Sequence, residues 1–135
     1  MNQHLRAAAA GLAGTAGYTL LSKTLKARAA THHESVQPVT VAAALTGTEA
    51  KPSGGLNFVL HWGYGAWGGV ARGLVERRLS GWRAEAAHLA VIWLPWRLML
   101  LAKRGHRTSP QALALDFVKH SVYVLVTGAV HRKIR

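Results

Sequence analysis

Two histidines of this 135-residue chain, one near the middle and one near the end, stand in matching surroundings. Asn57 precedes His61 by four residues, and Asp116 precedes His120 by the same interval. Residues four apart lie one turn apart on a helix, so each Asn or Asp oxygen can accept a hydrogen bond from the imidazole ring. Such a partner fixes the tautomer and leaves the second ring nitrogen available to a metal ion.

The pair allows two kinds of chemistry. Two histidines on parallel helices of one bundle could ligate a haem iron from both sides, which predicts a haem- or small-ligand-binding or transport module built on His61 and His120. Alternatively, each ring is neutral and hydrogen-bonds across a helix interface together with Tyr64 and Tyr123, and such bonds contribute about 0.6 kcal/mol each. We expect the structural role, without a metal or cofactor, and keep haem as the alternative.

The recognisable catalytic patterns are missing from the sequence. It contains no HExxH, P-loop or GxSxG motif and no carboxylate dyad, and only five residues are acidic. We therefore expect a protein that is not an enzyme.

The composition favours a negatively charged partner surface. The chain has 17 Lys and Arg residues but only five Asp and Glu, which gives a net charge of +12. Half of its residues are hydrophobic. Nucleic acid or the anionic lipids of a bilayer could balance such a charge. Five tryptophans favour the bilayer, because Trp prefers the membrane–water boundary. The basic residues gather at the ends of apolar stretches instead of along one helix face, so a peripheral nucleic-acid-binding protein is the less favoured alternative.

Four apolar stretches organise residues 1–135 into one domain. They cover about 5–25, 55–76, 84–103 and 109–131, and each is flanked by Lys or Arg. A membrane-spanning helix needs about 20 residues. We predict an all-α, multi-pass four-helix bundle in the bacterial inner membrane, despite a low mean hydropathy of +0.10. In the first connection, QPVTVAAALTG at 37–47 predicts a short helix lying on the membrane surface.

Glycines recur at a spacing that suits close helix contacts. Gly65, Gly69 and Gly73 are four apart, and Gly11 and Gly14 mark similar positions in the first stretch. A glycine inside a water-exposed helix costs about 1 kcal/mol relative to alanine, whereas in a bilayer it lets two helices approach closely. This glycine zipper predicts a structural or accessory subunit that packs with a second copy or a larger membrane complex.

The second and fourth stretches contain an internal repeat. NFVLHWGYGAWGG at 57–69 aligns with DFVKHSVYVLVTG at 116–128. The repeat predicts two duplicated helix pairs with the same membrane orientation. The pattern H-x-x-Y-G-x-x-x-G, present as His61, Tyr64, Gly65 and Gly69, resembles that of a group of small bacterial inner-membrane proteins of unknown function. The second copy departs from it, because Val124 replaces the first glycine. The resemblance implies a four-helix integral membrane protein and supplies no activity.

Several other polar residues fall inside the predicted spans. Asp116 and Lys119 are three apart and can neutralise each other. Buried, the pair would suggest a proton or ion path, but we expect an interfacial, solvated helix end. Arg97 lies close enough to the end of its stretch to reach the headgroups. Trp93 is expected to act as an aromatic anchor.

Overall fold

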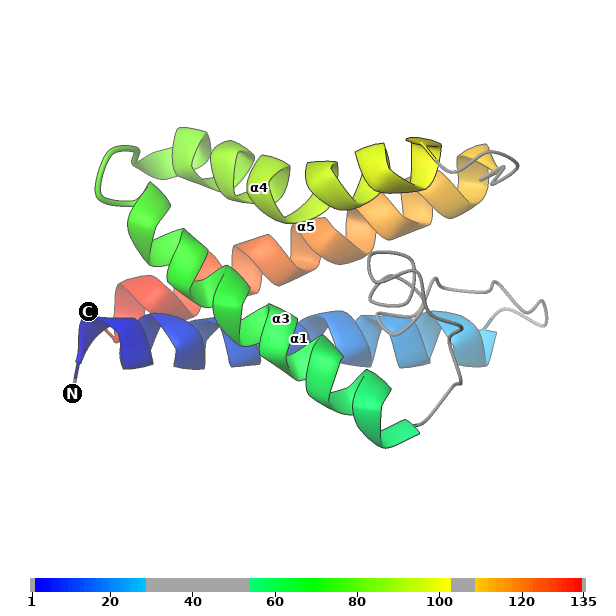
Figure 1. The fold of residues 1–135 in the computed structure, drawn as a ribbon, viewed down its shortest axis with the longest axis horizontal. Coiled ribbons are helices and arrows are strands. Elements are labelled where there is room, and N and C mark those ends of the chain that lie inside the picture. The colour runs from blue at the N-terminus through cyan, green and yellow to red at the C-terminus, as the bar shows by residue number, and fades with distance from the viewer. Residues whose placement is uncertain (1, 29–53, 103–108, 135) are drawn as a thin grey trace.

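The computed structural model describes residues 2–28, 54–102 and 109–134, and this part of the chain consists of four helices without a strand (Figure 1). The helices are α1 (Gln3–Arg28), α3 (Gly54–Val75), α4 (Gly81–Ala102) and α5 (Pro110–Lys133). The predicted all-α fold is confirmed, and each helix begins and ends within a few residues of its predicted stretch. The surface helix predicted at 37–47 lies outside the described residues.

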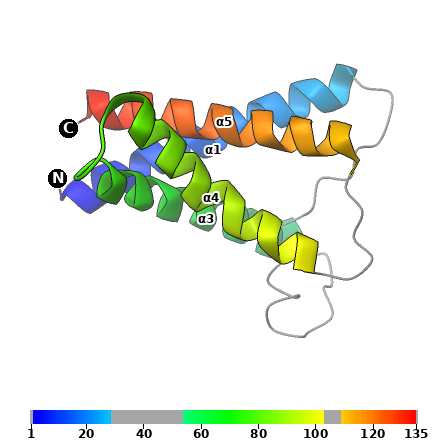
Figure 2. The ribbon, with the colours of Figure 1, turned by 90° about the horizontal axis from the view of Figure 1, so that it is seen from above.

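The helices alternate in direction. α1 and α4 run one way along the long axis, and α3 and α5 run the other way (Figures 1 and 2). The two helices that carry the sequence repeat therefore point in the same direction. α1 packs against both of them, and α4 packs against α3 and α5. We call the end of the bundle that holds the N-terminus, the C-terminus and residues 76–80 the terminal end, and the other the opposite end.

Local sequence accounts for where two of the helices begin. The Ser109 hydroxyl accepts a hydrogen bond from the Ala112 N–H (3.1 Å), and Pro110 follows at the first helical position. Both residue types are preferred at those positions. α4 begins at Gly81, whose φ of +58° is readily adopted only by a residue without a side chain. This short turn brings the end of α3 next to the start of α4.

Gly65 and Gly69 of α3 pack closely against α1 of the same chain. A Cβ atom on Gly69 would lie 2.6 Å from the Gly11 nitrogen, and one on Gly11 would lie 2.7 Å from the Gly69 nitrogen. A Cβ on Gly65 would collide with the Thr15 hydroxyl, while one on Gly14 would lie 2.8 Å from a carbonyl oxygen of α5. The stripe is therefore the contact between α1 and α3, and it is not a surface left open for another chain. Contact is looser at Gly73, where an added Cβ would lie 3.3 Å from its nearest neighbour.

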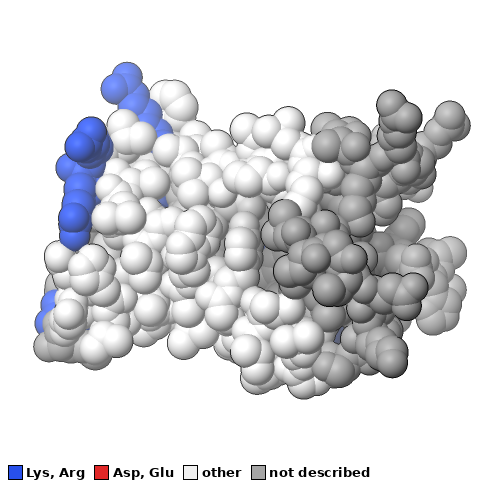
Figure 3. Space-filling view, viewed as in Figure 1, with Lys and Arg blue, Asp and Glu red and all other residues white. Residues whose placement is uncertain are grey.

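The interior is more polar than that of a water-soluble domain. The largest fully buried side chains are Arg72, His88, Thr15 and Thr127. Hydrophobic side chains instead lie on the outside, including Leu20, Phe58, Val59, Trp67, Trp82, Leu98 and Leu125, each more than half exposed. On the face in Figure 3, Lys and Arg gather at the terminal end, and the remaining described surface is almost free of charge. In soluble proteins the usual distribution is the reverse, with charged groups rarely buried.

One helix of the described chain, α5 at Pro110–Lys133, is long and apolar enough to cross a membrane. The other three predicted spans are not supported by this criterion. α1 has seven alanines and three glycines among its 26 residues and four Lys or Arg, α3 has seven glycines, and α4 carries Arg83, Glu85 and Arg97 within its length. Glycine and charged residues both lower the mean hydropathy of a helix.

Candidate functional site

Polar side chains of the interior form two clusters. The histidine cluster lies toward the opposite end and comprises Tyr18, Thr19, His61, Trp93, Arg97, Asp116 and His120. The arginine cluster lies at the terminal end and comprises Arg72, Glu76, Glu85, His131 and Arg132. Each cluster joins at least three helices, so the arrangement of the bundle is what brings its members together.

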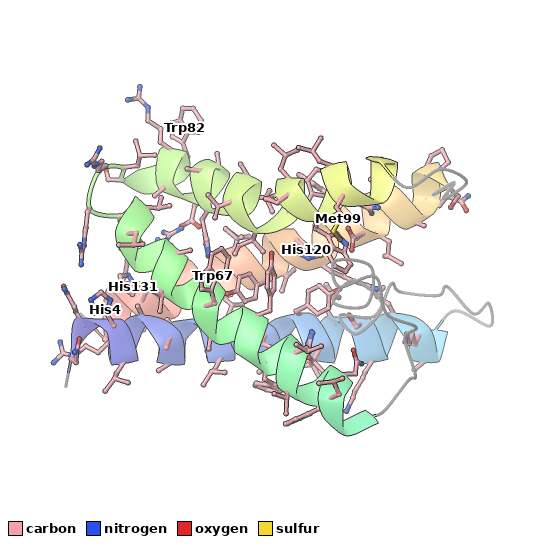
Figure 4. All side chains as sticks on the ribbon, viewed as in Figure 1. His4, Trp67, Trp82, Met99, His120 and His131 are labelled. Carbon is pink, nitrogen blue, oxygen red and sulfur yellow. The ribbon has the colours of Figure 1, made fainter. Side chains whose placement is uncertain are left out.

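In the histidine cluster, α1 supplies the residue that connects the two repeats. The Tyr18 ring lies 5.6 Å from the His61 ring and 5.2 Å from the His120 ring, measured between centroids. Figure 4 shows His120 within the bundle. The His61 Nε2 atom is 3.1 Å from the Thr19 hydroxyl. The two histidines thus contact the same tyrosine, Tyr18, which the sequence analysis did not select.

The predicted partners of the histidines behave differently in the two copies. The His120 Nδ1–H donates to the Asp116 carbonyl oxygen (2.8 Å), and a carboxylate oxygen of Asp116 lies 3.4 Å away. His61 bonds with Thr19 instead of Asn57, and the Asn57 Oδ1 atom is buried without a hydrogen-bond partner. The repeat therefore preserves the positions of the histidines but not their hydrogen bonding.

Asp116 belongs to an interhelical ion pair. Its Oδ2 atom accepts bonds from an Arg97 guanidinium nitrogen and from the Trp93 indole N–H, both at 2.8 Å. Arg97 is only 8% exposed, so it does not extend to the surface as predicted. Arg97 of α4 lies next to the Asp116 carboxylate of the antiparallel helix α5. A buried charge is costly unless it is paired, so each of the two groups stabilises the other. Lys119 is also buried, contrary to the expected solvated helix end.

Two findings concern the metal and haem alternatives at the histidine cluster. A group of three His, Cys, Asp or Glu side chains suited to a metal ion does not occur among the described residues. Tyr18 contacts both His61 and His120. A haem held between the two rings would therefore have to displace the tyrosine.

The arginine cluster is a set of charge-assisted hydrogen bonds that joins α3, α4 and α5. Arg72 is completely buried and donates to both carboxylate oxygens of Glu85, at 2.7 and 2.8 Å. It also donates to Glu76 at 2.8 Å. From α5, His131 donates to Glu76 (2.8 Å) and Arg132 donates to Glu85 (2.8 Å). Bidentate pairing of this kind is geometrically specific, so the cluster fixes α3, α4 and α5 relative to one another.

The sequence analysis did not select Arg72. Two signals could have identified its role. Arg72 interrupts the stripe between Gly69 and Gly73, and Glu76 follows it at the four-residue spacing of a helical ion pair. Glu85 is separated from it by the turn between helices, so its pairing depends on how the helices are arranged.

Between the clusters, the two repeat tyrosines join neighbouring helices. Tyr64 donates to the Ile92 carbonyl of α4, and Tyr123 donates to the Gly65 carbonyl of α3, both at 2.7 Å. The completely buried His88 donates from Nε2 to the Gly68 carbonyl (2.9 Å). These contacts agree with the expected role of Tyr64 and Tyr123 in helix packing.

No protein-family model, curated protein or solved structure matches this chain. The resemblance to small inner-membrane proteins therefore stays a prediction.

Proposed function

We propose that this chain is a small integral membrane protein of the bacterial inner membrane, with a structural or accessory, non-enzymatic role. The observation that most supports this proposal is that polar side chains are buried and hydrophobic side chains are exposed. The four largest fully buried side chains are polar, whereas Phe58, Trp67 and Leu125 are each more than half exposed. Burying apolar surface is worth about 25 cal/mol per Å² in water, so lipid is the more favourable surrounding for this exterior.

Ion pairing inside the bundle also accounts for part of the low mean hydropathy of this chain. Arg72 and Glu85 lower the average for α3 and α4, yet they bond to each other inside the bundle. Arg97 is likewise paired with Asp116. Charged groups at membrane depth typically face the bundle interior and pair with one another. The lipid-facing sides of these helices are therefore more apolar than their averages.

The terminal end suits a layer of anionic headgroups. Arg77, Arg78 and Arg83 are exposed there, next to an uncharged band (Figure 3). Trp82 is 75% exposed, and the Arg83 guanidinium lies 5.9 Å from its ring centroid (Figure 4). Tryptophan and arginine commonly mark the boundary between lipid chains and water.

In an accessory role, the bundle would contact its partner through its outer faces. Because the glycine stripe is occupied by α1, a second copy or a larger membrane complex would have to contact another surface. The stacked Tyr64 and Trp67 rings, 5.8 Å apart, lie on an exposed part of α3 that such a partner could cover. Both polar clusters consist of groups bonded to one another across helices, which favours a packing role over a catalytic one.

The test is extraction of the full chain from bacterial membranes. We expect the protein to remain with the membrane through high-salt and alkaline carbonate washes and to dissolve in detergent. Recovery in either wash would contradict an integral protein and favour the peripheral, nucleic-acid-binding alternative. An absorbance spectrum of the detergent-purified protein then tests the haem alternative, since a Soret band lost in His61→Ala and His120→Ala would replace the structural role.

A further inference from the structure

A cavity of about 300 Å³ opens at the terminal end, between the first turns of α1, the end of α3 and α5. Its basic lining consists of His4, Arg6, Arg77 and His131, and Figure 4 shows the two histidines at this end of the bundle. Its apolar lining consists of Ala7, Val70 and Leu74. The cavity therefore combines a basic rim with an apolar wall.

Among the described residues, no carboxylate pairs with the arginines that line this cavity. Neither Arg6 nor Arg77 takes part in an ion pair within the described residues. Glu76 also lines the cavity, but its carboxylate is bonded by Arg72 and His131. The first turn of α1 holds no acidic residue, so the positive end of its helix dipole adds to the potential. An anion with a single negative charge would offset half of the charge of Arg6 and Arg77.

The geometry points to a binding site for the phosphate group of an anionic phospholipid, an inference that depends on the proposed membrane location. Arginine forms charge-assisted hydrogen bonds with phosphate oxygens, so Arg6 and Arg77 would hold the headgroup at the rim. The acyl chains would then leave along Val70 and Leu74, and Leu74 is half exposed on the outer surface of α3. A phospholipid has the required order of groups, with an anion at one end and hydrocarbon at the other.

The experiment uses the full chain, purified in detergent and stripped of lipid. Phosphatidylglycerol or phosphatidylcholine is added, and bound lipid is counted by native mass spectrometry. We expect the unaltered protein to prefer phosphatidylglycerol at least tenfold. The double variant Arg6→Gln/Arg77→Gln should lose this preference. The matched control Arg78→Gln/Arg83→Gln removes the same charge from the same end, outside the cavity, and should keep it.

Three results would overturn the inference. Equal loss in both double variants would assign the preference to overall charge. Complete displacement of the lipid by millimolar inorganic phosphate would assign the cavity to free phosphate. Equal binding of phosphatidylglycerol and phosphatidylcholine by the unaltered protein would show that the cavity does not select an anionic lipid. Circular dichroism checks the helix content of each variant, and if the double variant loses helix, the single variants Arg6→Gln and Arg77→Gln replace it, each expected to weaken binding about threefold.

Failure here is distinguishable from failure of the proposed function. A protein that stays in the membrane through alkaline washing but shows no lipid preference overturns only the site. A protein released by that washing overturns the membrane location on which the site depends.

Discussion

The two polar clusters solve the problem of buried charge in different ways. In the arginine cluster, the completely buried Arg72 is held by two carboxylates, which α5 bonds from the other side. The histidine cluster contains one ion pair, Arg97–Asp116, among aromatic rings. Among its members, the Arg97 Nε atom is buried without a hydrogen-bond partner, whereas no side-chain atom of the arginine cluster is. The difference indicates that the terminal end is fixed by charge and the opposite end by ring packing.

The largest expected effect comes from Arg72→Gln. The substitution leaves Glu85 and the buried Glu76 without their shared cation, and breaking a buried ion pair costs about 3–5 kcal/mol. We expect the unfolding free energy in detergent, measured by denaturant titration, to fall by that amount. A loss no greater than that of Arg97→Gln would remove the distinction between the clusters.

A second substitution tests the close contact between α1 and α3, the helix that carries Arg72. Gly69→Ala places a methyl group within 3 Å of Gly11 backbone atoms, and overpacking of this kind costs about 1–3 kcal/mol. Gly63→Ala is the matched control, because nothing lies within 4 Å of an added Cβ there. Thermal unfolding should separate the two variants, and equal melting temperatures would argue against the tight contact.

At the histidine cluster, Arg97→Gln should have a smaller effect than Arg72→Gln. Asp116 keeps its bond from Trp93 and remains about one-fifth exposed, so water partly replaces the arginine. We expect a loss of about 1–2 kcal/mol, within the range for one unsatisfied polar partner. A loss above that of Arg72→Gln, measured by the same titration, would reverse the comparison.

The smallest effects are expected for the tyrosines between the clusters. Tyr123→Phe removes the hydrogen bond to the Gly65 carbonyl, and Tyr64→Phe removes the bond to Ile92. Each should cost about 0.6 kcal/mol, the average of measured interhelical bonds in a membrane protein. A double-mutant cycle by denaturant titration checks whether the losses add, and strong coupling would mean that the two clusters communicate through this layer.

The sequence predicts the helices better than their partners. Apolar stretches bounded by Lys and Arg locate all four helices, since these signals are local along the chain. The glycine spacing of α3 correctly predicts a close contact but not that Gly11 would provide the opposing surface. His61 and His120 both contact Tyr18, a neighbour that the repeat does not indicate.

The missed residues share a physical cause. Tyr18 contacts His61 and His120 only because α1 packs against both repeat helices. Arg97 was expected at the surface, yet it pairs with Asp116 because α4 and α5 run antiparallel. Such pairings depend on how the helices are placed relative to one another, which residue spacing along the chain does not contain.

The position of α1 has a consequence for the order of assembly. Gly14 of the first helix fits against Tyr123 of the last helix, near the other end of the sequence. During synthesis, α1 can meet α3 early through its glycines, but its second face has no partner until α5 emerges from the ribosome. Domains acquire such long-range contacts late in synthesis. A nascent chain stalled before residue 110 should therefore leave the Gly14 face of α1 uncovered, and the final helix should complete the bundle in a single late step.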